Sequence, residues 1–409
     1  MTAVRRLVGT IQVGGLYVLL LLLPFSKAVV EISFGILFLS WLFQRCDPAT
    51  RTDTVWLTPR FRPLACAILA YLAACALSVA VSKTPLLSLN GFINKWVEYL
   101  LFFVVAVDLG RRPGVVRSGL AILAVSSFFV FIEAVTQERF GRGIFMGHSY
   151  RDYQRAIGPY ENPIDLATYL MVVIPLILMA AIQRRRMLRA LLWSLLVCLV
   201  VLLARTDALG AWLGLCLGLL AFLAGQPAVR RDGLILLAGI VLFCGVIPQG
   251  KGQGQRQPHQ KEAFSFARFG TTDRWNMWQA ALGMIRDRPI LGHGVNTFMS
   301  NYLDYWVGGE RQPRYAHNCY LQVAAETGIV GLVTFVGLLG LIFARWLSAL
   351  RRGARSDDRL ALAGFAAGLL AFVLQAGIDT NFYSLRQAAL FWILAGLATG
   401  LSDRCQATS

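Results

Sequence analysis

The chain has 409 residues, of which 56% are apolar and only 15% are charged, and its mean hydropathy is +0.58. This is more apolar material than a water-soluble domain of the same length needs for its core, so the composition predicts a polytopic membrane protein. The 39 Lys and Arg outnumber the 22 Asp and Glu, but they stand in short clusters between apolar runs, as loop charges do. We therefore expect no nucleic-acid partner.

The apolar runs predict the fold class. Runs able to supply about 17–25 residues of spanning helix occur near 8–25, 28–44, 63–82, 92–110, 115–136, 163–183, 188–204, 209–225, 233–249, 326–347, 360–379 and 386–402. The expected fold is thus an all-α, polytopic integral membrane protein of about twelve transmembrane helices. In this scheme residues 1–249 hold helices one to nine with a loop at 137–162, residues 250–318 form a large loop, and residues 319–409 hold the last three helices.

The distribution of basic residues predicts the orientation. With both termini in the cytoplasm, the short inner segments hold 21 Lys and Arg and the short outer loops hold five. The other 13 fall in 137–162 and 250–318, which this orientation places on the outer face. Long loops cross a membrane regardless of charge, so these residues form either a solvated basic surface or a surface that faces a polyanion.

The large loop is expected to be partly helical. Residues 250–261 are rich in Gly and Gln and are typical of a mobile segment. From Asp273, a plausible helix cap, apolar residues recur at helical spacing until Pro289, which predicts an amphipathic helix against the membrane surface.

The outer loops contain arginines suited to phosphate. Arg142, Arg151 and Arg155 lie within 14 residues, and their planar guanidinium groups match phosphate oxygens. An arginine at the edge of the hydrocarbon also snorkels to water without any such role. Asn162 and Pro163 follow at a position typical of a helix start.

Arg274 in the second loop stands beside tryptophans. It precedes Trp275 and Trp278, whose rings are expected at a membrane interface or against a sugar face.

His317 is the candidate catalytic residue. It is one of four histidines, it is followed by Asn318, and polar residues here run directly into an apolar span. A helix through it would bring Tyr320, Leu321 and Ala324 onto its face. Asp379 could orient the imidazole by accepting a ring N–H. The alternatives are that His317 only packs at the membrane interface and that Asp379 only caps a helix.

The sequence contains no motif typical of metal, cysteine, serine-nucleophile or nucleotide-binding chemistry. The four histidines, His148, His259, His293 and His317, are widely spaced, and the sequence has no Asp-x-Asp pair and no His-x-x-x-His. The eight cysteines form no CxxC pair, and neither a GxSxG elbow nor a Walker or GxGxxG loop is present. We therefore expect no metal and no cofactor.

Three sequence blocks together resemble a known family. They are RxxGxxxNPxxxAxYL at 155–170, DRWNMWQAALGMIRDRPILGHGVNTF at 273–298 and HNxxLxxxxExGxxGL at 317–332. Their order and spacing resemble the O-antigen ligases and the related O-antigen polymerases and O-oligosaccharyltransferases of bacterial inner membranes, which implies a GT-C-like fold. One departure is LARTDALGAWLGL, where Arg205 lies upstream of the position at which the family often has Ser-Arg before Gly-Ala-Trp.

The resemblance implies a reaction. It is the transfer of a glycan from undecaprenyl pyrophosphate to the lipid A core, inverting and metal-independent, on the periplasmic side of the inner membrane. His317, whose imidazole is typically neutral near pH 7, would be the base. Arg155 and Arg274, with Arg142 in reserve, would hold the pyrophosphate, and the supporting residues would be Asn162, Asn318, Asp379 and Trp278. The alternatives are an O-antigen polymerase, a protein O-oligosaccharyltransferase and a transporter of lipid-linked glycans.

Overall fold

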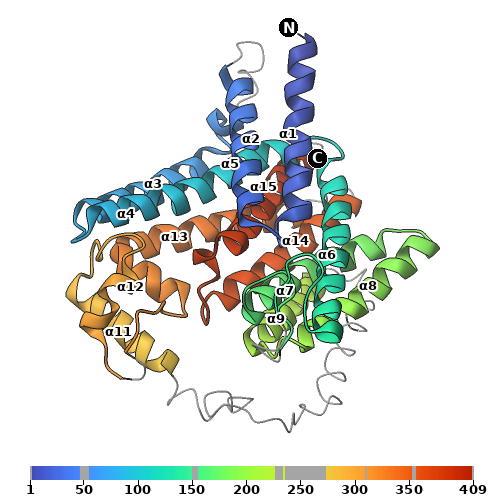
Figure 1. Ribbon diagram of the computed structural model, residues 1–409. Helices are drawn as coiled ribbons and strands as arrows, with labels where there is room; N and C mark the ends of the chain where they lie inside the picture. Colours follow the sequence, from blue (N-terminus) through green and yellow to red (C-terminus); the bar gives the residue numbers. More distant parts are fainter. Residues whose placement is uncertain are drawn as a thin grey trace.

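The regular structure of the chain is helical. The computed structural model describes residues 2–46, 55–149, 155–225, 234, 273–308, 311–351 and 356–407. In these residues every secondary-structure element is a helix (Figure 1), and the one β-bridge, between Arg142 and Ser149, is isolated. The expected all-α fold class is confirmed.

The helices have the following bounds. They are α1 (Thr2–Leu22), α2 (Lys27–Cys46), α3 (Arg62–Ala80), α4 (Pro85–Gly91), α5 (Glu98–Gly110), α6 (Val115–Phe140), α7 (Pro163–Ile182), α8 (Arg186–Ala204), α9 (Leu209–Gly225), α11 (Asp273–Asp287), α12 (Phe298–Asn301), α13 (Cys319–Arg351), α14 (Ser356–Gln375) and α15 (Leu385–Ala407). Short 3-10 turns occur at Val55–Leu57, Tyr302–Tyr305 and Asn381–Tyr383, and a π-helical turn at Phe92–Val97 joins α4 to α5.

Many of these helices can cross a bilayer. Among the described residues, eight are long and apolar enough, namely α1, α2, α3, α6, α7, α8, α13 and α15. The apolar part of α9, Leu209–Ala221, is shorter, and helices also lie on the expected spans at 92–110 and 360–379. The expected span at 233–249 and the expected mobile segment at 250–261 lie outside the described residues, apart from Leu234. The chain is a multi-pass membrane protein.

The last helix, α15, packs closely against α5. Side chains of α15 such as Leu390 and Trp392 are fully buried. A Cβ on Gly396 would lie 2.5 Å from the carbonyl oxygen of Phe103, and one on Gly400 would lie 2.1 Å from that of Val107. Glycine at these two positions lets the helix backbones touch, which is how helices associate in a solvent that offers no hydrophobic drive between them.

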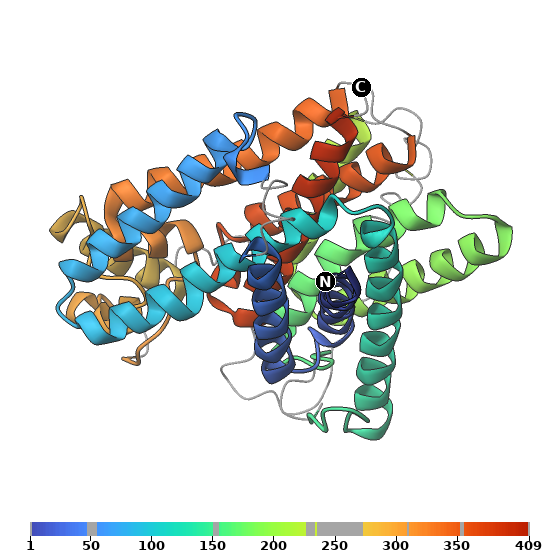
Figure 2. The same cartoon turned by 90° about the horizontal axis from the view of Figure 1, so that it is seen from above.

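A kink in α13 positions the segment before α12. Gly328 has φ 67° inside the helix, and a Cβ there would lie 2.1 Å from the carbonyl oxygen of Ile290. The backbone N–H of Ile329 donates to Pro289 at 2.8 Å, and Gly294 donates to the carbonyl of Glu326 at the same distance. The loop between α11 and α12 therefore docks onto the kink. Both views place α3 alongside α13 (Figures 1 and 2).

The ends of two helices differ from the ends of the expected spans in a way that affects the site. The helix that contains the span expected near 326–347 begins at Cys319, and the helix on the span expected at 360–379 ends at Gln375. Apolarity locates a span in the bilayer but does not fix where its helix begins or ends. Asp379 consequently lies in a turn after α14.

Candidate functional site

His317 lies in the turn that leads into α13. Its φ is 47°, in the left-handed region that residues other than glycine seldom adopt. Asn318 caps the helix, because its Oδ1 accepts the backbone N–H groups of Tyr320 and Leu321, both at 3.0 Å. The expectation that a helix through His317 places Tyr320, Leu321 and Ala324 beneath the imidazole is therefore wrong, since the chain turns before α13 begins.

The imidazole of His317 lies against the carboxylate of Asp379. Nδ1 is 3.4 Å from Oδ1, and the two side chains are 31% and 12% exposed. The backbone N–H of Cys319 donates to the carbonyls of Ala376 (2.8 Å) and Asp379 (3.1 Å), which ties the start of α13 to the turn after α14. An ionised carboxylate can only accept, so a hydrogen bond here requires the proton on Nδ1 and leaves the lone pair of Nε2 for a substrate.

Arg274 reaches the same turn from the first turn of α11. Its Nη1 donates to the carbonyl of Ile378 at 3.1 Å, and Ile378 directly precedes Asp379. The amphipathic helix expected from 273 is present as α11. Its first turn places a guanidinium group beside the residue that contacts His317.

Arg155, between α6 and α7, is held by the turn before α9. Its Nε donates to the carbonyl of Thr206 at 2.8 Å, and its Nη2 contacts the same oxygen. Burial lowers the pKa of the Arg155 guanidinium, the charge of Asp207 opposes that shift, and the charge of Arg274 adds to it. The two guanidinium groups are thus close enough to repel each other, although they come from the two different loops.

The start of α9 packs against the turn after α14. A Cβ on Gly210, in the first turn of α9, would lie 2.5 Å from Cδ1 of Ile378, so α9 and this turn are in direct contact. One imidazole, its carboxylate partner and two guanidinium groups are therefore collected from segments that are far apart in the sequence. Chemically, the group offers one proton acceptor next to two cations that stay charged at any physiological pH.

A second carboxylate lies near this group. Asp165 and Asp379 repel each other electrostatically. Asp165 is fixed in the first turn of α7 by Asn162, whose Oδ1 accepts its backbone N–H at 2.8 Å and whose Nδ2 donates to its carboxylate at 2.9 Å. Asn162 is thus the cap of α7, as the sequence predicted.

Three other predicted residues have different surroundings. Arg142 is exposed, and within the described part of the chain no contact joins it to His317, Arg155 or Arg274. Trp278 packs at 6.4 Å, ring centre to ring centre, against Trp275. Asn318 has the capping role already described.

Arg205, whose place in the site the sequence left open, pairs with Glu138 at the end of α6. The neighbouring carbonyl of Thr206, rather than the Arg205 side chain, is what holds Arg155.

Sequence reasoning missed two buried charges. Arg386, counted as an outer-loop charge, is only 3% exposed and donates to the carbonyls of Pro24 and Pro159 at 2.8 and 3.0 Å. Glu326 is fully buried, and its carboxylate accepts from the backbone N–H of Asn296 and the hydroxyl of Tyr383 at 2.8 and 2.9 Å. Each ties distant segments together. Their only sequence signal was a charge at the edge of an apolar run.

The described residues contain no cluster of three or more His, Cys, Asp or Glu that could hold a metal ion.

Comparison with known proteins identifies relatives. Residues 194–336 match the family model described as O-antigen ligase. A Rickettsia felis protein named "Putative polysaccharide ligase" is 24% identical over 80% of this chain and 77% of its own length, and a similarly named Rickettsia typhi protein is 23% identical over the same shares. The exopolysaccharide production protein ExoQ of Rhizobium meliloti is 26% identical over 43% of this chain and 41% of its own. The matched range 194–336 includes Arg205, Arg274 and His317.

Proposed function

We propose that this O-antigen ligase-family protein transfers a glycan from undecaprenyl pyrophosphate to the lipid A core oligosaccharide. The observation that carries the proposal is the contact of His317 with Asp379 beside Arg274 and Arg155. A lipid-linked pyrophosphate donor already contains an activated glycosyl bond. The enzyme needs only a base for the acceptor and cations for the leaving group.

His317 is the general base in this proposal. Its Nε2 takes the proton of an acceptor hydroxyl, and the hydroxyl oxygen bonds to the anomeric carbon of the donor sugar while the bond from that carbon to the pyrophosphate breaks. The proton stays on the imidazole, and undecaprenyl pyrophosphate leaves with the bond electrons. Direct attack inverts the anomeric centre, and general-base catalysis contributes a rate factor of about 10²–10⁴.

Arg155 and Arg274 hold the pyrophosphate while its negative charge grows. Guanidinium groups bind phosphate oxygens in pairs of hydrogen bonds. In the structure each guanidinium group donates to a backbone carbonyl, Arg155 to that of Thr206 and Arg274 to that of Ile378. These hydrogen bonds fix the position of each group without neutralising its charge. Fixed charge aimed at a leaving group is effective because it needs no reorganisation during the reaction. Asp379 holds the imidazole and stabilises its charged form.

The setting follows from the orientation that the basic residues predict. Both termini would be cytoplasmic and the site would face the periplasm at the bacterial inner membrane. Lipids would reach it from the bilayer. A divalent ion would have no part, because the two arginines supply the positive charge that such an ion provides elsewhere.

A glycan polymerase or a protein O-oligosaccharyltransferase would use the same chemistry and differ in the acceptor. The partial similarity to an exopolysaccharide production protein supports keeping a growing glycan as the second candidate acceptor. The discriminating experiment supplies purified protein in lipid nanodiscs with radiolabelled donor and, in turn, rough lipopolysaccharide, a second lipid-linked glycan and an unfolded acceptor peptide. Label on lipopolysaccharide supports the ligase.

The same assay tests the remaining claims. His317→Ala is expected to abolish transfer, and full activity of that variant would remove His317 from the mechanism. EDTA is expected to leave the rate unchanged. A loss of activity in EDTA that added Mg²⁺ or Mn²⁺ restores would overturn the metal-free proposal. Movement of labelled lipid across the bilayer without a covalent product would instead favour a transporter.

A further inference from the structure

We propose that a groove between α11 and residues 304–307 binds an oligosaccharide that takes part in the reaction. This inference rests on the proposed glycan transfer and extends it, because it assigns residues to a glycan subsite. The groove has a volume of about 650 Å³, a size typical of small-molecule sites.

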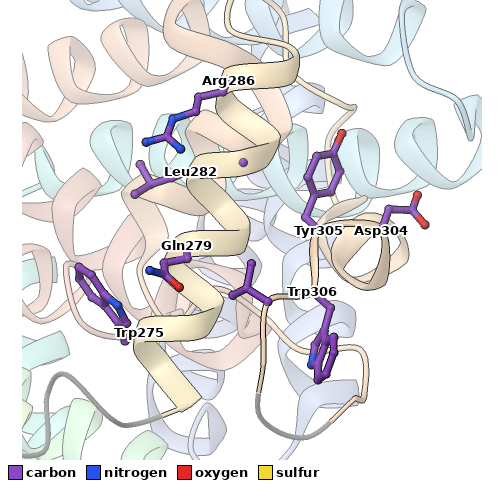
Figure 3. Close-up of a pocket in the computed structure, with 9 residues that line it drawn as sticks. Trp275, Gln279, Leu282, Arg286, Asp304, Tyr305 and Trp306 are labelled. Carbon is purple, nitrogen blue, oxygen red and sulfur yellow. The ribbon is translucent and has the colours of Figure 1, made fainter.

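One wall of the groove is a single face of α11 and the other is a short segment after α12. The residues of α11 are Trp275, Gln279, Leu282, Gly283 and Arg286, and those of the facing segment are Asp304, Tyr305, Trp306 and Val307 (Figure 3). The spacing 275, 279, 282 and 286 is that of one helical face, so the same helical register that buries Met277, Ala281 and Met284 turns these side chains outward.

Two tryptophan rings flank the groove. Trp275 is 43% exposed and Trp306 is 37% exposed. The guanidinium carbon of Arg311 lies 5.8 Å from the centre of the Trp306 ring, which covers one face of that ring. An amphipathic aromatic ring with an open face suits the apolar face of a sugar ring, because it offers a large rigid contact at little cost in side-chain entropy.

Polar groups in the same groove distinguish a sugar from a lipid chain. Within the described part of the chain, the side chains of Gln279, Arg286 and Asp304 take part in no hydrogen bond or ion pair, and all three are exposed. An amide, a guanidinium and a carboxylate together provide donors and acceptors for hydroxyl groups. A membrane-facing surface would place apolar residues at these positions instead.

One end of the groove lies on the same turn of α11 as Arg274. Arg274, which contacts the carbonyl beside Asp379, directly precedes Trp275. From Trp275 to Arg286 the helix rises by about 16 Å at 1.5 Å per residue. A glycan whose reacting sugar lies at His317 would therefore have a path along α11 for several further sugar rings.

The far wall of the groove is fixed before any ligand binds. A Cβ on Gly283 would lie 3.2 Å from Cδ1 of Tyr305, so glycine allows the two walls to approach. The hydroxyl of Tyr305 donates to Asp287 at 2.6 Å, across the same contact. A preformed wall lowers the entropy that a flexible glycan site would otherwise lose on binding.

Calorimetric titration of the full-length protein in nanodiscs tests the proposal. The two probes are the core oligosaccharide released from rough lipopolysaccharide by mild acid and the glycan released from the donor lipid. Trp306→Ala and Gln279→Ala are expected to raise the Kd of one probe about tenfold, which is about 1.4 kcal/mol. Phe140→Ala, which removes an exposed aromatic side chain at the end of α6 (76% exposed), is expected to leave that Kd unchanged. The affected probe shows whether the groove serves acceptor or donor.

Transfer kinetics separate this inference from the proposed function. The groove variants are expected to raise the KM of the same substrate and to change kcat by less than about twofold, since they remove uniform binding. If both variants have an unchanged Kd and KM, or only a lower melting temperature, the glycan groove is refuted. An inactive His317→Ala would still support the transferase in that case. If the protein transfers no glycan but the variants bind the probe more weakly than the wild type does, the transferase proposal is refuted and the glycan groove is supported.

Discussion

Asp379→Asn isolates the contribution of one negative charge to catalysis. Asparagine keeps the shape of the side chain and an Oδ1 acceptor for the backbone N–H of Thr380, which lies at 2.8 Å. What is lost is the charge 3.4 Å from Nδ1 of His317. In the proposed mechanism that charge matters in the transition state, when His317 takes a proton and becomes cationic.

The separation sets the size of the effect. Two unit charges 3.4 Å apart attract by about 5 kcal/mol at an effective dielectric constant of about 20 and by about 1 kcal/mol in water. The imidazole is 31% exposed, so solvent screens the pair and we expect about 1–3 kcal/mol. Transfer should then slow by about 5–150-fold in kcat, with little change in KM.

The assay measures initial rates of label transfer from lipid-linked glycan to rough lipopolysaccharide in nanodiscs. Asp357→Asn, an exposed carboxylate at the other end of α14, is the matched control and should retain the full rate. A normal kcat for Asp379→Asn, in a protein that His317→Ala inactivates, would refute the reasoning. A rise in KM alone would place Asp379 in substrate binding.

Four further single variants and one double variant test the remaining parts of the site and its support. Arg155→Ala and Arg274→Ala should each reduce kcat by about 10²–10³-fold. If both groups hold one pyrophosphate, the double variant should reduce kcat by less than the product of the two single reductions. A reduction equal to that product would assign the two arginines separate roles. Gly328→Ala should lower the melting temperature in detergent because its φ of 67° and its contact distance of 2.1 Å exclude a Cβ, whereas Gly337→Ala, with nothing within 4 Å, should melt as the wild type does. Glu326→Ala should destabilise the fold by about 3–5 kcal/mol, since buried partners lose their acceptor, and an unchanged melting curve would contradict that structural role.

The sequence predicted the site residues unevenly, and the reason lies in what each prediction depended on. Asn162 as a helix cap is a local property of a few residues, and the structure has it. The position of His317 relative to α13 depends on where the helix begins; the sequence interpretation continued a helix through His317, whereas α13 begins at Cys319. Arg142, which the sequence analysis kept in reserve to Arg155, is exposed, whereas Arg155 is held by the carbonyl of Thr206.

The sequence alone determined that this is an all-α membrane protein and which segments form most of its helices. It also indicated His317 as a candidate site residue. Those conclusions depend on the bilayer, which demands long apolar helices whatever their neighbours are. Only the tertiary structure decided that the start of α9 touches the turn after α14, and that Arg274 and His317 both contact that turn, at Ile378 and at Asp379. Such contacts join residues far apart in the chain, and they are set by how closely helices pack rather than by any property that a single segment carries.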